Sequence, residues 1–368
     1  MGKEAELYIK HGISTEHECF TADEARDKLK HGMKIAIREG SAAKNFDALV
    51  ELFSEAPHML MFCSDDKHPD SLVEGHINQL VYRALEAGHG FYDVLHAACI
   101  LPVDHYGLEV GTLQIGDQAD FVIYSNLNDW IPEATYINGQ KVAEDGKTLI
   151  ESKVTKIVNQ FNCSPIQQEQ IQVPKQGNQI KVIEALDGQL ITNIKRYEPK
   201  LENGMVISDP KRDLLKLVMV NRYQDAPPAI AFIKNFNLKS GAIASSVGHD
   251  SHNIIAVGVT DEAIVKAINL LISEKGGISA VHEKGKQVLP LPVAGLMSDK
   301  NGFSVAEAYT EIDQMAKVMG SKLAAPFMTL SFMGLLVIPH LKLSDLGLFD
   351  GDAFSFTSLF EEWELTIW

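Results

Sequence analysis

The sequence predicts an α/β region followed by an α+β region, and three observations support this. Apolar runs alternate with helical patterns in a βαβαβα order over residues 1–106. From 107 to about 150 the pattern changes to short strands separated by Gly and Asp turns. Longer strand-like and helical stretches fill residues 204–368, after an irregular, Gln- and Asn-rich connection with one or two strands over 151–203. We therefore expect four segments with these boundaries.

Each unit of the first segment runs from an apolar stretch through a polar loop into a helix. Residues 8–14 lead into the loop TEHE, and Thr21 opens a helix with Glu24 three positions later, as in a capping box. Residues 33–37 and 58–64 are two further apolar runs, followed by helical patterns around FDALVELF and SLVEGHINQLVYRALEAG. Successive parallel strands are expected from this alternation.

The polar residues of each unit come just after the apolar run, where (β/α)8 barrels carry their active sites. A complete barrel takes about 250 residues, whereas the pattern here changes at residue 107. The segment therefore predicts an incomplete TIM-type barrel, with about five of its eight units expected upstream of residue 1.

The remaining segments carry their own signals. Asn138-Gly139 between alternating residues predicts a hairpin in the small β-domain over 107–150. In the C-terminal α+β domain, LLKLVMVNRY, AIAFIKNF and NIIAVGV resemble strands, and DEAIVKAINLLISEKG and VAEAYTEIDQMAKVMG resemble helices. The apolar run at 327–338 is interpreted as a buried core element.

Composition limits the classes of partner. The 33 Lys and Arg residues against 49 Asp and Glu give a net charge of -16, which repels phosphate backbones and anionic lipids. We therefore expect neither a nucleic-acid nor a membrane partner. The four cysteines are widely spaced and show no disulfide framework, which favours a cytoplasmic location.

Two polar loops offer groups for metal-assisted hydrolysis. His17 and Glu18 follow the first apolar run, and a neutral imidazole there can bind a divalent metal. Asp65 and Asp66 follow the third, where a carboxylate can bind a metal and accept a proton from water. The alternatives are a solvated loop for the first pair and a turn or helix cap for the second.

The loop REGSAAKN offers Arg38, Glu39 and Ser41 as groups that could orient a substrate. The small residues around them fit helix-start packing equally well.

The loop SSVGHDSHN contains the densest cluster of ligand-type side chains, namely His249, Asp250, His252 and Asn253. The two histidines can converge only if the segment turns, because an extended strand points them to opposite faces. A hydrogen-bonded structural loop is the alternative. Because such polar groups are costly to bury for structure alone, we expect this loop to help close the active site.

Several blocks of the sequence resemble one known family. GISTEHECFTADEA, GMKIAIREGSAAKN, FCSDDKHPDSLVEGHINQLVYRAL, IASSVGHDSHNIIAVG, LPLPVAGLMSD and PFMTLSFMGLLVIPHLKLSD are similar, in this order, to blocks of the adenine deaminases of the amidohydrolase superfamily. The resemblance covers nearly the whole chain, and only residues 150–200 contribute little.

The resemblance implies a metal-dependent hydrolase that converts adenine and water to hypoxanthine and ammonia. It implies a divalent cation, with Mn, Fe or Zn as candidates, held by His17 and Asp65, with Asp66 as the alternative carboxylate. Asp65 would also act as the proton acceptor, and Glu18, Glu39 and Ser41 would line the purine pocket. The net charge of the chain is compatible with a neutral substrate such as adenine.

The sequence departs from the family pattern in one respect. No His-x-His metal pair precedes residue 8, so the chain is expected to be the C-terminal portion of such an enzyme. It would then be weakly active or inactive alone, and would associate with itself or with a missing N-terminal half. Two alternatives stay open: a cyclic-amide hydrolase of the dihydroorotase or hydantoinase type, and an inactive fragment with a role in assembly.

Overall fold

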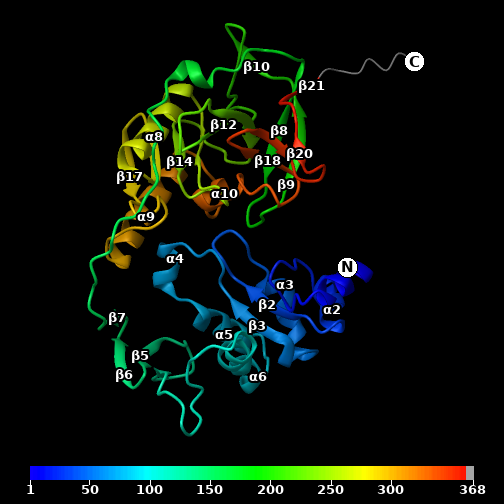
Figure 1. The fold of residues 1–368 in the computed structure, drawn as a ribbon, viewed down its shortest axis with the longest axis vertical. Helices are drawn as coiled ribbons and strands as arrows, with labels where there is room; N and C mark the ends of the chain where they lie inside the picture. Colours follow the sequence, from blue (N-terminus) through cyan, green and yellow to red (C-terminus); the bar gives the residue numbers. More distant parts are fainter. Residues whose placement is uncertain (362–368) are drawn as a thin grey trace. The chain divides into compact units, whose positions relative to one another are not determined.

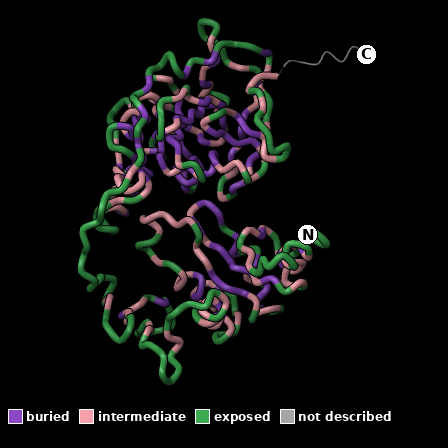
Figure 2. Tube along the Cα trace, viewed as in Figure 1, coloured by how far each residue is buried: buried purple, intermediate pink, exposed green. Residues whose placement is uncertain are grey.

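The structure is a computed structural model that describes residues 1–361, and the chain divides into two compact units. The first unit is Met1–Lys153 and the second begins at Val154. Each unit has its own buried segments, drawn in purple in Figure 2. Within the described residues, no helix is both long enough and apolar enough to span a membrane.

The first unit contains a parallel sheet of order β1-β2-β3, with β2 in the centre. These strands are β1 (Thr15–Glu16), β2 (Lys34–Arg38) and β3 (Leu60–Cys63). Strands β2 and β3 are labelled in Figure 1. Four of the five residues of β2 are buried, as expected for a central strand covered on both faces. The α-helices of this unit are α1 (Lys3–Lys10), α2 (Ala22–Lys30), α3 (Phe46–Leu49), α4 (Pro69–Glu74), α5 (Ile77–Glu86), α6 (Phe91–Leu95) and α7 (Leu101–Tyr106).

One expectation for the first unit is wrong. Residues 8–14 do not form a strand, because Lys3–Lys10 is the helix α1 and the strand begins only at Thr15. The segment KEAELYIK consists mainly of good helix formers, and an ion pair of 2.6 Å between Glu6 and Lys10 supports one face. The expected helix start at Thr21 is confirmed, since its hydroxyl accepts a hydrogen bond from the N–H of Glu24.

A four-stranded antiparallel sheet follows within the first unit. Its strands are β4 (Phe121–Tyr124), β5 (Pro132–Ile137), β6 (Gln140–Glu144) and β7 (Lys147–Thr148). The predicted hairpin is confirmed between β5 and β6, where Asn138 and Gly139 have φ values of 50° and 75°. Both central residues therefore adopt the positive φ that a type I′ turn requires.

The second unit is organised around a sheet of order β17-β16-β14-β15-β12-β13-β8-β21, with β9 paired to β8. Its pairs are antiparallel except for β13 with β8. The unit contains α8 (Asp261–Glu274), α9 (Gly302–Val318) and α10 (Pro326–Phe332), and every residue of α10 is buried, as expected for a core element. The strands are β8 (Gln179–Ala185), β9 (Thr192–Tyr197), β10 (Lys200–Glu202), β11 (Met205–Ile207), β12 (Leu215–Val220), β13 (Ala229–Lys234), β14 (Ala242–Ser245), β15 (Ile254–Gly258), β16 (Gly277–His282), β17 (Gly285–Pro290), β18 (Leu341–Ser344), β19 (Gly347–Asp350), β20 (Ser355–Phe356) and β21 (Phe360–Glu361).

The stretch expected as an irregular connection with one or two strands, 151–203, belongs to the second unit from Val154 on. It supplies β8, which lies inside the large sheet, together with β9 and β10. The side chains of Ile180, Val182 and Ile183 are fully or almost fully buried. Their polar neighbours in sequence lie toward solvent, and this weakens the apolar signal that predicts a strand.

Candidate active site

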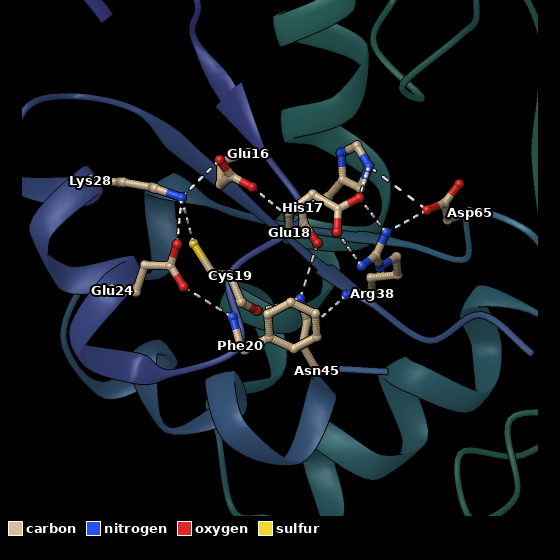
Figure 3. Close-up of polar contacts among 10 residues, drawn as sticks. All are labelled: Glu16, His17, Glu18, Cys19, Phe20, Glu24, Lys28, Arg38, Asn45 and Asp65. Atoms are coloured by element: carbon tan, nitrogen blue, oxygen red, sulfur yellow. Dashed lines mark hydrogen bonds and ion pairs between the residues drawn. The ribbon is translucent and has the colours of Figure 1, made fainter. Parts of the chain in front are cut away.

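The candidate site lies at the carboxyl-terminal edge of the parallel sheet in the first unit. His17 and Glu18 follow β1, Arg38 is the last residue of β2, and Asp65 follows β3 by two positions. Because parallel strands end at the same edge, these four side chains come together although they are far apart in sequence (Figure 3). The sequence-based expectation that His17 and Asp65 lie near each other therefore agrees with this arrangement.

The three potential metal ligands are close to one another. The His17 Nε2 atom lies 3.3 Å from Glu18 Oε1 and 3.7 Å from Asp65 Oδ2. One ligand atom from each residue can be chosen so that all three lie within 4.8 Å of one another. Asp65, rather than Asp66, supplies the second carboxylate of this cluster.

Arg38 binds both carboxylates from inside the protein. Its side chain is 1% exposed, and its two terminal nitrogens donate to the Glu18 carboxylate over 2.9 and 2.8 Å. The same Nη1 atom donates to Asp65 Oδ2 over 2.6 Å. Arg38 therefore neutralises part of the acidic cluster and holds the two carboxylates next to each other at its terminal nitrogens.

The ionisation of the cluster follows from these contacts. Burial alone would raise the pKa of Glu18, but hydrogen bonds from His17 and Arg38 outweigh it and lower that pKa to about 2. The hydrogen bond with Glu18 raises the pKa of His17 above its ordinary value, although burial works in the opposite direction. Glu18 is therefore ionised over the whole physiological range.

A second polar cluster supports the loop that carries His17 and Glu18. The Lys28 ammonium on α2 binds Glu16 and Glu24, each over 2.9 Å, and lies 3.5 Å from the Cys19 sulfur. Glu16 in turn accepts a hydrogen bond from the N–H of Glu18 over 2.5 Å. The start of the helix after β1 is thereby tied to the site loop (Figure 3).

The loop that carries Asp65 is held by the segment after β2. Asp65 has a φ of 52°, and the neighbouring carbonyl of Asp66 accepts a hydrogen bond from the N–H of Ser41. The Ser41 hydroxyl accepts a hydrogen bond of 2.9 Å from the N–H of His68. A Cβ atom on Gly40 would lie 2.9 Å from the Ser64 carbonyl oxygen, so the two loops approach too closely for any larger residue.

Two residues expected to contact a substrate have other contacts. The Glu39 carboxylate forms ion pairs with Arg83 over 3.2 Å and with Lys44 over 3.7 Å. Ser41 bonds to the loop after β3, as described above. Each of these contacts provides a structural role for the residue.

The loop containing His249, Asp250, His252 and Asn253 lies in the second unit and does turn. His252 has a φ of 53°, and the imidazole rings of the two histidines have centroids 5.6 Å apart. The ring of His249 stacks on Phe332 at 4.5 Å and its Nδ1 atom bonds to Ser331 Oγ over 2.6 Å. Asn253 is buried, and its side chain accepts a hydrogen bond from the N–H of Arg222. Asp250 is exposed to solvent.

Sequence reasoning did not identify Asn45, which is buried between β2 and the loop after β1 (Figure 3). An Asn directly before a helix is ordinarily interpreted as a helix cap. Its side chain makes no cap hydrogen bond here, and bonds instead to the backbone of Arg38, His17 and Cys19. No short sequence signal distinguishes the two arrangements.

The donor set suits a divalent cation. One imidazole nitrogen and two carboxylate oxygens are ligands that Mn, Fe and Zn all accept. His17 and Asp65 were expected as ligands, and Glu18 joins them. These three groups, which come from the loops after β1 and β3, could therefore hold a divalent cation.

Comparison with known proteins agrees with the sequence resemblance. Residues 1–142 match the amidohydrolase family and residues 189–355 match the adenine deaminase C-terminal domain. The second match begins inside the stretch expected as a connection, as does the sheet of the second unit.

Several relatives carry the name adenine deaminase. The protein from Salinibacter ruber is 52% identical, covering 98% of this chain and 66% of its own length. That from Methanosarcina mazei is 48% identical (98% and 67%), and that from a Sulfurovum species is 51% identical (96% and 65%). The chain thus spans about two thirds of the length of the relatives that it matches. The chain belongs to the adenine deaminase family.

Proposed function

We propose that this chain forms part of the active site of an adenine deaminase, which hydrolyses adenine to hypoxanthine and ammonia. The observation that carries the proposal is the His17–Glu18–Asp65 cluster at the end of a parallel sheet, in a chain about 50% identical to proteins of that name.

Three residues of the cluster would hold the cation. A bound divalent metal lowers the pKa of a coordinated water, so that it can act as a nucleophile near neutral pH. His17 and Asp65 would bind the cation, with Glu18 as an additional ligand. Mn, Fe and Zn are the candidates.

The other roles follow from the chemistry of each side chain. Asp65 would accept a proton from the attacking water and transfer it toward N1 or the leaving amine of adenine. Arg38 would hold the Asp65 carboxylate fixed in direction through its 2.6 Å hydrogen bond. Asp66 is the alternative proton acceptor, while Glu39 and Ser41 would shape the purine pocket from behind the site.

We also propose that the site is completed by polypeptide outside this sequence. Among the described residues β1 and β3 each pair only with β2, and about a third of the relatives' own length lies outside the part that this chain matches. An incomplete TIM-type barrel made of this sheet would then pair with a missing N-terminal half, or with another copy. The four free cysteines fit a cytoplasmic location.

The loop of His249, Asp250, His252 and Asn253 is proposed to close over the purine. Its turn brings two imidazoles together beside exposed Asp250. In an experimental structure of the complete enzyme, the distances from His249 and His252 to Asp65 decide the matter. A loop that faces solvent in every subunit would remove these four residues from the site.

The proposal is tested by reconstitution. This chain would be coexpressed with the part of the Salinibacter ruber relative that it does not match, loaded with Mn, Fe or Zn, and assayed for ammonia release from adenine. We expect activity in the reconstituted sample and little or none in the chain alone. Dihydroorotate is the comparison substrate, and turnover of it in place of adenine would overturn the assignment.

Variants sharpen this test. Asp65→Asn should abolish turnover without loss of the fold, because the near-isosteric amide is a poor base and a weaker ligand. His17→Ala should lower the metal content. Loss of activity in Asp66→Asn with near-normal kcat in Asp65→Asn would show that Asp66 has the catalytic role.

A further inference from the structure

Asn45 forms hydrogen bonds to both sides of the candidate site with a single amide group. Its side chain is 4% exposed. The Oδ1 atom accepts a hydrogen bond from the N–H of Arg38 over 2.6 Å. The Nδ2 atom donates to the carbonyl of His17 over 3.2 Å and to that of Cys19 over 3.0 Å. All these partners are main-chain groups of the cluster or of its immediate neighbour (Figure 3).

The sheet itself does not fix the loop after β1. The ladder between β1 and β2 contains two registered pairs, Thr15 with Lys34 and Glu16 with Ile35. It therefore stops before His17. Beyond this point, over residues 17–19, the described residues show no strand pairing with β2. The side-chain amide of Asn45 connects this loop to the end of β2 instead.

The hydrogen bonds of Asn45 hold the two backbone segments that carry Glu18 and Arg38. Glu18 lies between the two carbonyls that Asn45 holds, and its carboxylate faces the Arg38 guanidinium. The Arg38 backbone is held by the same amide. A shift of either segment would therefore change the spacing between Glu18 and Arg38, and with it the spacing between His17 and Asp65.

We propose that Asn45 is a positioning residue that sets the separation of the metal-binding groups His17 and Glu18 from Arg38 and Asp65. The inference rests on the proposed function only in that these groups bind a cation. Asn45 touches none of the reacting atoms, so it acts through the backbone of the residues that do.

An amide suits these three hydrogen bonds because its oxygen accepts and its nitrogen donates. Asn45→Asp keeps an acceptor for the Arg38 N–H but places carboxylate oxygen against two carbonyl oxygens, which repel it. Asn45→Ala removes all three bonds. Asn269 in α8 is a matched control, since its amide also binds a backbone N–H and a backbone carbonyl, those of Ile166, each over 2.9 Å, in the second unit.

The experiment measures hydrogen exchange and metal binding in the full chain and its variants. We expect Asn45→Asp and Asn45→Ala to raise amide exchange at residues 17–20 at least about tenfold, because opening of that loop no longer breaks these bonds. The apparent affinity for Mn²⁺, measured by competition with a chelator, should fall by a similar factor. Asn269→Ala should leave both quantities unchanged.

The outcomes separate the two hypotheses. If the Asn45 variants lower the melting temperature but leave exchange at 17–20 and Mn²⁺ affinity as in the wild type, Asn45 is an ordinary core residue and the inference is overturned. If the wild type binds no Mn²⁺, the proposed metal site fails, while the exchange measurement still decides the role of Asn45. If one variant does not fold, the other provides the test.

Discussion

At the scale of single residues, the charge balance of the site depends on Arg38. Its buried guanidinium faces two carboxylates that would otherwise repel each other across a half-exposed site. A buried cation in this position costs desolvation free energy, and the two short ion pairs offset that cost. Arg38 therefore holds Glu18 and Asp65 close together in the candidate site.

Gly40→Ala is expected to disturb the Asp65 loop. The new Cβ would lie 2.9 Å from the carbonyl oxygen of Ser64 and 3.0 Å from that of Asp66. Because both are backbone atoms, they can move away only if the loop itself shifts. We expect a loss of about 1–3 kcal/mol in the free energy of unfolding, measured by urea titration. Gly302→Ala is the control, since its Cβ meets nothing within 4 Å. Equal effects of the two substitutions would contradict the close approach of the two loops.

Lys342 gives a prediction about pH. Its side chain is fully buried in the second unit, and its ammonium donates to the carbonyls of Leu190 and Phe332 over 2.6 and 3.2 Å. No carboxylate of residues 1–361 forms an ion pair with it. Burial lowers the pKa of Lys342 to about 7.

Because the unfolded chain keeps the ordinary pKa of 10.5, it binds the proton more strongly than the folded chain between pH 7 and about 10. Stability therefore rises with pH across this window, by at most about 1.4 kcal/mol per pH unit from this group. Lys342→Met removes this contribution. The unfolding free energy of the variant minus that of the wild type should therefore be smaller at pH 9.5 than at pH 6.5. A difference independent of pH would refute a lowered pKa.

At the scale of elements, α2 holds the site loop through its first turn and through Lys28. Thr21→Ala removes the hydrogen bond from the Glu24 N–H and should cost about 1 kcal/mol in unfolding free energy. Thr21→Ser keeps the hydroxyl and should restore most of that loss. The measurement is urea unfolding of the three proteins, and a Ser variant as unstable as the Ala variant would argue against the cap.

The elements that local signals specify were predictable. Thr21 at a helix start, the Asn138-Gly139 turn and the buried strands β2 and β3 follow from short patterns. Helix α1 was missed because its apolar residues resemble a short strand. The strand β8 lies in a stretch where one or two strands were expected without bounds, because polar residues interrupt its apolar ones.

The candidate site was predictable only in part. His17 and Asp65 could be named because reactive residues follow parallel strands, and Glu18 because it lies beside His17. The contacts of Arg38 and Asn45 depend on atoms brought together from different loops, which sequence spacing does not encode.

At the scale of the whole molecule, the first unit leaves apolar surface uncovered. Leu113 and Ile115, in the segment before β4, and Ile131, directly before β5, are 71%, 108% and 63% exposed. Among the described residues the edges of β1 and β3 are also unpaired. Uncovered strands and apolar patches of this kind favour association.

We expect the chain alone to self-associate in sedimentation velocity runs at increasing protein concentration. Replacing Leu113 and Ile115 together by Lys should shift the distribution toward monomer. Val318→Lys on α9 is the control, because Val318 is equally exposed at 71% but lies in the second unit. A wild-type chain that stays monomeric at all concentrations would rule out this prediction.

The rate at which Cys19 is alkylated can be used to measure how often the loop after β1 opens. Its thiol is fully buried, and burial raises its pKa to about 12, whereas Cys99 is exposed. Since alkylating reagents attack thiolates, Cys19 reacts only when the loop after β1 opens to solvent. The ratio of Cys19 to Cys99 alkylation, followed by mass spectrometry, thus records how often the loop opens. A cation that binds His17 and Glu18 should slow the labelling of Cys19 and leave that of Cys99 unchanged.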